Sequence, residues 1–151
     1  MTVVYVAGPL IAAPSLPEAR AYYEKLADLV RTAGLDPIVP HLETDPERAA
    51  HLTPTQVWEA DRAKIDRSDV VLAHVGLPSS GVGAELAYAC AGGKQIIALH
   101  RPAESVSKLL LGMLRERGAR EVVSDDEDLD RVLVPALAAA AAAMAARQSR
   151  S

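Results

Sequence analysis

The chain has 151 residues, the size of one domain, and half of them are apolar, which is enough for a substantial core. Its formal net charge of −4 argues against a nucleic-acid polymer as partner, because such binding needs a basic surface. The single cysteine, Cys90, excludes an intramolecular disulfide and is typical of a reducing, cytoplasmic setting. No stretch is as strongly apolar as a membrane span, and the Ala-rich residues 135–147 are interpreted as a terminal helix of a soluble protein with no membrane partner.

Strands and helices are expected to alternate, because short β-rich runs alternate with segments whose apolar residues recur at helical spacing. In chain order we expect a strand at residues 2–7, a helix at 15–34, a strand at 36–43, a helix at 53–68, a strand at 69–75, a helix at 82–93, a strand at 94–100, a helix at 106–118, a strand at 119–124 and a helix at 125–147. Pro135 should bend or break the last helix.

This alternation predicts a single α/β domain with right-handed crossovers between parallel strands. We expect a flavodoxin-like (Rossmann-like) three-layer sandwich with a five-stranded parallel sheet, spanning residues 1–146, and a disordered tail at 147–151. Ligands of such sheets bind at the carboxyl ends of the strands. The loops AGPL, LPSSGVGAE and HRPAES, which follow the first, third and fourth strands, are therefore where a site is expected.

Asp61 is the most informative single residue of the chain. It lies three residues after Trp58 and four before Ile65, so it interrupts an apolar helix face that should point inward. A buried acid without a partner is costly. Asp61 is therefore either bonded to a nearby backbone group or held in a partly dry pocket with a shifted pKa.

Glu85 follows the turn formed by Ser79, Gly81 and Gly83, and we expect it in the first turn of the next helix. An acid there is favoured by the helix dipole and can have no further role. The alternative is a functional carboxylate, because the turn before it is of the kind that leads an anion to a helix N-terminus.

A family resemblance adds to this interpretation. The stretch VYVAGPL and the pattern D-x7-D-V-V-x-A followed by P-S-x-G-V-G-x-E-L are similar to the nucleoside 2-deoxyribosyltransferase superfamily. Within it, the chain most resembles the branch of 2'-deoxynucleoside 5'-monophosphate N-glycosidases. The resemblance extends from the first strand to the helix after the fourth strand.

The resemblance implies catalytic roles at three matching positions. Glu85 would be the nucleophile, Asp61 would assist proton transfer at the base or sugar, and Tyr5 would lie beside the nucleophile. The expected reaction is cleavage of the N-glycosidic bond of nucleosides or nucleoside 5'-monophosphates through a covalent glycosyl–Glu intermediate. The alternatives are a transferase that exchanges bases between deoxynucleosides, and a binding module that has lost turnover.

The resemblance also implies which residues contact the substrate. Ser79 and Gly81 would meet the 5' end of the sugar, and Gly83 belongs to the same turn. Gly8 and Pro9 form the loop after the first strand. His41 would contact the base, with a surface position as the alternative.

The expected partner is a small nucleoside or nucleotide. We expect no cofactor, and no metal, since the histidines show no metal-ligand spacing. The family implies a homodimer or larger assembly with shared active sites. In the monophosphate hydrolases a serine early in the helix after the fourth strand reaches the neighbour's phosphate. Leu111 takes that place here, with Ser105 or Ser107 as substitutes, so the choice between nucleotide and nucleoside stays open.

Overall fold

The computed structural model describes residues 1–150, which form one five-stranded sheet with all strands parallel. The strand order is β2-β1-β3-β4-β5, which confirms the predicted flavodoxin-like order. The strands are β1 (Val3–Ala7), β2 (Asp36–Ile38), β3 (Val70–His74), β4 (Gln95–His100) and β5 (Arg120–Val123).

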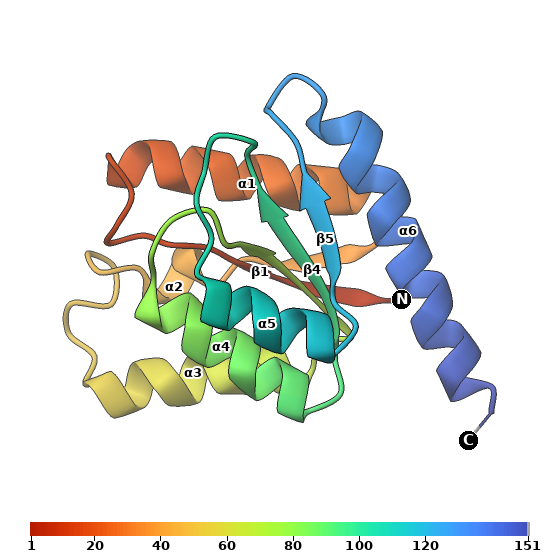
Figure 1. Ribbon diagram of the computed structural model, residues 1–151. Helices are drawn as coiled ribbons and strands as arrows, with labels where there is room; N and C mark the ends of the chain where they lie inside the picture. Colours follow the sequence, from red (N-terminus) through yellow and green to blue (C-terminus); the bar gives the residue numbers. More distant parts are fainter. Residues whose placement is uncertain (151) are drawn as a thin grey trace.

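Helices cover both faces of this sheet and complete the predicted three-layer sandwich. Helices α1 and α6 pack on one face, and α3, α4 and α5 pack on the other (Figure 1). Their bounds are α1 (Leu16–Thr32), α2 (His41–Thr44), α3 (Pro54–Asp66), α4 (Ser80–Ala91), α5 (Lys108–Glu116) and α6 (Leu129–Gln148).

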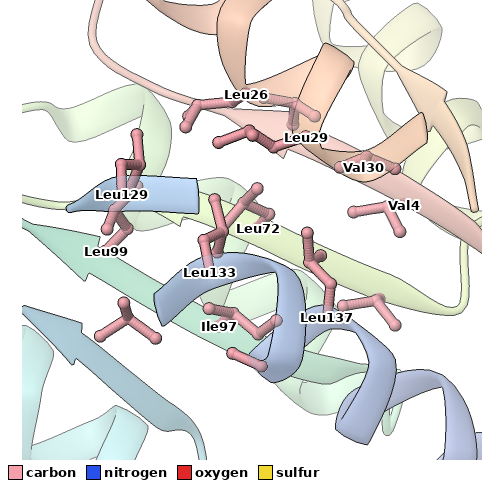
Figure 2. Close-up of a cluster of buried hydrophobic side chains, with 14 of the residues drawn as sticks. Val4, Leu26, Leu29, Val30, Leu72, Ile97, Leu99, Leu129, Leu133 and Leu137 are labelled. Atoms are coloured by element: carbon pink, nitrogen blue, oxygen red, sulfur yellow. The ribbon is translucent and has the colours of Figure 1, made fainter. Parts of the chain in front are cut away.

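The two faces of the sheet carry two separate hydrophobic clusters, because successive strand residues point to opposite sides. Val4, Leu72 and Ile97 face α1 and α6, and their partners in Figure 2 include Leu26 and Leu133. The alternate strand positions face the other helices, and that cluster contains Tyr5, Val71, Ala98, Ile65 and Leu86. Strand β3 is buried along its whole length, as a central parallel strand should be.

Side-chain caps set the helix starts that the sequence predicted. The Ser15 hydroxyl accepts a hydrogen bond from the Glu18 N–H at the start of α1. Thr53 and Gln56 form a complete capping box at the start of α3. These caps satisfy N–H groups that have no partner within their own helix.

The predicted second strand, residues 36–43, is wrong beyond Ile38. Pro40 adopts right-handed helical dihedral angles, φ −63° and ψ −31°, and is the N-cap residue of the short helix α2, which begins at His41. Its carbonyl accepts hydrogen bonds from the N–H groups of Glu43 and Thr44. Proline fixes φ near the helical value, which explains why the chain turns here instead of extending the sheet edge.

Helix α6 is continuous through Pro135, so the proline does not break it. The helix also contains Arg147 and Gln148, the first residues of the expected tail, and Ser151 lies outside the described residues. Among residues 1–150, α6 alone is long and apolar enough to cross a membrane, with a mean hydropathy of 1.6. Its first half packs on the sheet through the buried Leu129, Leu133 and Leu137, and 28% of its most apolar 18-residue window is buried.

Replacement of Leu133 by Ala should lower the free energy of unfolding by about 2–5 kcal/mol, because Leu133 is fully buried and a cavity would remain. Leu42→Ala is the control, since this side chain is half exposed, and we expect it to cost about 1 kcal/mol or less. Urea unfolding measures both values. Equal losses would contradict the placement of α6 on the sheet.

Candidate active site

Two adjoining cavities open at the carboxyl end of the sheet, where the topology predicts a ligand site. The outer pocket has a volume of about 390 Å³ and is lined by the loop after β1, the loop between α2 and α3, and the start of α4. The inner cavity has a volume of about 50 Å³ and contains both Asp61 and Glu85 in its lining. Gly8, Leu10, Thr44 and Glu85 line both, so the two cavities meet at Glu85.

Glu85 lies in the second turn of α4 and not in the first, because α4 begins at Ser80, two residues before the predicted start. The predicted position in the first turn is therefore wrong, and the helix dipole, which acts within that turn, does not account for this acid. The Tyr5 hydroxyl donates a hydrogen bond of 2.7 Å to Glu85 Oε1. The structure thus brings these two predicted catalytic residues together.

Burial raises the pKa of Glu85 to about 7. The nearby negative charge of Asp61 acts in the same direction, whereas the hydrogen bond from Tyr5 stabilises the carboxylate and opposes the rise. Burial and the charge of Glu85 hold the pKa of Tyr5 far above its usual range. Tyr5 therefore remains a hydroxyl donor, and Glu85 changes its ionisation near neutral pH.

Asp61 lines the inner cavity, and its side chain is 15% exposed. It is bonded to a side chain and not to the backbone: the Thr44 hydroxyl donates to Oδ1 at 2.8 Å. Burial raises the pKa of Asp61, and Thr44 and the positive charge of Lys64 oppose that rise. Of the predicted apolar face, Ile65 is buried, but Trp58 is exposed and packs edge-to-face on Tyr88 at the surface.

His41 is 3% exposed, so the surface alternative is wrong. It is the first residue of α2, not the end of a strand, and it lines the inner cavity with Asp61 and Glu85. No group among residues 1–150 forms a hydrogen bond with its Nε2, since Glu24 Oε1 lies 3.7 Å away. Burial lowers the pKa of His41 and favours the neutral imidazole.

The loop after β1 is anchored by Tyr23 of α1. The Tyr23 hydroxyl donates to the Pro9 carbonyl at 2.7 Å, and a Cβ atom added at Gly8 would overlap the Tyr23 ring. Gly8 lines both cavities, whereas Pro9 is buried and lines neither. Gly8 is thus required for close packing, and Pro9 shapes the loop through its carbonyl.

The predicted turn before Glu85 divides between two surfaces. Ser79 caps α4 by accepting from the Val82 N–H at 3.2 Å, and both Ser79 and Gly81 line the outer pocket. Gly83 lines an apolar groove between α4 and α5, which adjoins the outer pocket and also has Ser79 in its lining. Within residues 1–150, no three His, Cys, Asp or Glu side chains group closely enough to hold a metal ion.

Sequence reasoning missed Thr44, Lys64 and Tyr23. Thr44 was missed because α2 was interpreted as strand and loop. Lys64 lies three residues after Asp61, a spacing that pairs side chains on a helix and could have indicated it. Nothing local marks Tyr23, because its role depends on the fold bringing α1 beside the loop after β1.

Comparison with known proteins identifies the family. Residues 4–132 match the family described as Nucleoside 2-deoxyribosyltransferase, and the chain belongs to this family. A protein of Thermofilum pendens, named as a candidate 2'-deoxynucleoside 5'-phosphate N-hydrolase, is 33% identical over 133 residues, covering 85% of this chain and 91% of its own. The mouse 5-hydroxymethyl-dUMP N-hydrolase is 34% identical, covering 77% of this chain and 70% of its own.

Solved structures agree on the fold. The CMP N-glycosidase of Clostridium botulinum superposes with a TM-score of 0.64 at 20% identity, covering 90% of this chain and 98% of that chain. This likeness confirms the predicted α/β architecture independently of close sequence similarity.

Replacement of Glu85 by Gln should stabilise the protein at pH 8. The pKa of Glu85 is about 7 in the folded state against an ordinary 4.5, so its contribution to stability is fully present below pH 4.5 and is lost as the pH rises to about 7. Gln does not titrate, so at pH 8 we expect the free energy of unfolding to rise by up to about 3 kcal/mol. Urea unfolding at pH 5 and pH 8 measures it. A gain that is larger at pH 5 would contradict the raised pKa.

Proposed function

We propose that the protein is an N-glycosidase that cleaves the bond between base and sugar in nucleoside 5'-monophosphates or nucleosides. The observation that carries the proposal is a carboxyl group, Glu85, held by Tyr5 at the junction of two cavities and accompanied by Asp61. Membership of the nucleoside 2-deoxyribosyltransferase family supports the same chemistry. The names of the Thermofilum and mouse relatives support nucleotide hydrolysis in particular.

The outer pocket would bind the sugar and its 5' end. Free N–H groups at the start of α4 can donate hydrogen bonds to an anion or a hydroxyl. Ser79 and Gly81 line the pocket at this point. The sugar would then extend toward Glu85, one turn further along the helix. Asp61 and His41, on the other side of Glu85, would meet the base.

In the first step, Glu85 attacks the anomeric carbon C1'. The bond between C1' and the base nitrogen breaks, and an ester bond forms between C1' and the free oxygen Oε2, since Tyr5 occupies Oε1. The base leaves with its bonding electrons and takes a proton from Asp61. The negative charge of Glu85 stabilises the positive charge that develops on the sugar.

In the second step, water attacks C1' and the ester to Glu85 breaks. The proton lost by the water passes to Asp61, which is thereby restored for the next turnover. The sugar is released with a hydroxyl at C1'. Transfer is the alternative outcome: a second base takes the place of water and yields a new nucleoside, as the family description implies.

We also propose that the protein forms a homodimer in the cytoplasm, with the apolar groove between α4 and α5 as the contact. The groove, of about 710 Å³, is lined mainly by apolar side chains, and it shares Pro78, Ser79 and Val82 with the outer pocket. Leu109 at its rim is 86% exposed. A second copy there would bury Leu109 and place Ser105 or Ser107 beside the neighbouring site. The single, buried Cys90 is compatible with a reducing compartment.

The test is release of free base from a panel of nucleosides and nucleoside 5'-monophosphates, with and without a second free base. Wild type should release base and free sugar, and Glu85→Gln should lower kcat about a thousandfold or more. A new nucleoside in the presence of the second base would instead identify a transferase. Unchanged turnover in Glu85→Gln would exclude Glu85 as the nucleophile.

Replacement of Leu109 by Asp should convert the dimer to a monomer, because a charge cannot be buried in an apolar contact without a partner. Light scattering coupled to size-exclusion chromatography measures the mass. Val123→Asp, on the exposed surface of β5, is the control and should leave the dimer intact. A monomeric wild type would contradict the proposal.

A further inference from the structure

Lys64 is a buried lysine beside the active site that the proposed reaction does not use. It lies on α3 and is only 6% exposed. Its Nζ is 3.5 Å from Asp61 Oδ1 and 3.0 Å from Glu43 Oε2. Lysine is almost never buried unless it is paired, and the better-shielded of its two partners is the carboxyl that lines the inner cavity.

Thr44 donates to the same oxygen of Asp61. The Thr44 hydroxyl lies 2.8 Å from Asp61 Oδ1 and 2.9 Å from the Pro40 carbonyl oxygen, and it has one proton to give. The Pro40 oxygen already accepts two backbone N–H groups, those of Glu43 and Thr44. Both of its lone pairs are therefore occupied, and the hydroxyl proton points to Asp61.

The two carboxyl oxygens of Asp61 consequently differ in their hydrogen-bond partners. Oδ1 accepts from the Thr44 hydroxyl and faces the ammonium group of Lys64. No donor among residues 1–150 forms a hydrogen bond with Oδ2, although Asp61 lines the inner cavity. Oδ2 is thus the oxygen left for a ligand.

We propose that Lys64 is a positioning residue of this active site, which together with Thr44 occupies Asp61 Oδ1 so that Asp61 exchanges its proton with the nucleobase only through Oδ2. The inference rests on the proposed function for the identity of the ligand. The placement of the two donors on Oδ1 is independent of it. Lys64 acts through Asp61 and lines neither cavity.

The charge of Lys64 has a second effect, on the ionisation of the pair of acids. A positive charge at this distance favours the carboxylate form of Asp61, against the burial that disfavours it. It also lowers the pKa of Glu85. The titratable groups that face this pair of acids from the packed elements are Tyr5 of β1, Tyr23 of α1, His41 and Glu43 of α2, and Lys64 of α3.

The test is to replace Lys64 by Met, which keeps the length of the side chain and removes its charge. Carbon-13 NMR of the carboxyl carbons follows the titration of Asp61 and Glu85 directly. We expect the midpoint of Asp61 to rise by about one pH unit or more in Lys64→Met and to stay near the wild-type value in Lys64→Arg. Thr44→Val should also raise the titration midpoint of Asp61. Where the enzyme turns over, the pH profile of kcat/KM should move to higher pH with it.

Lys25→Met is the matched control, because it removes the same charge from the exposed surface of α1, on the opposite face of the sheet. It should leave both midpoints unchanged. An unchanged Asp61 midpoint in Lys64→Met, or an equal rise in Lys64→Arg, would overturn the role of Lys64. These midpoints are measured without turnover, whereas absence of base release from wild type would overturn the proposed function alone.

Discussion

The hydrogen bond between Tyr5 and Glu85 connects the chemistry of the site to the centre of the sheet. Tyr5 has no exposed surface, and it pairs with β2 on one side and β3 on the other. Its hydroxyl therefore has a position that only a rearrangement of the core could change. Burial of the Glu85 carboxyl raises its pKa to about 7, while the hydrogen bond from Tyr5 favours the carboxylate. The position of this acid and its ionisation therefore both depend on its contact with β1.

The turn at Pro40 decides which side chains reach the second acid. A strand continuing through residues 36–43 would have carried the chain along the sheet edge. Because Pro40 caps the start of α2 instead, His41 and Thr44 both line the inner cavity, and Thr44 bonds to Asp61. The short helix α2 accordingly supplies the part of the site that contacts Asp61, while β1 and α4 supply the part around Glu85.

Most of the fold could be predicted because its signals are local. The caps at Ser15 and Thr53 mark the starts of α1 and α3, and apolar runs mark β1, β3 and β4. The alternation of strands and helices along the chain predicts that the strands are parallel. The segment after Ile38 was predicted wrongly, because a proline-interrupted run fits an edge strand as well as a helix start. In the site, the motif around Glu85 indicated the residue proposed as nucleophile. The positions of Thr44 and Lys64 depend on how α2 packs against α3, which no local pattern expresses.

The contact between Gly8 and Tyr23 limits how this site can vary among relatives. The aromatic ring occupies the space that any side chain at position 8 would need. A larger residue there would be tolerated only if position 23 became smaller at the same time, and the hydroxyl that holds Pro9 would then be lost. The two positions should therefore covary, so that in a library of variants the effect of a change at one depends on the residue at the other.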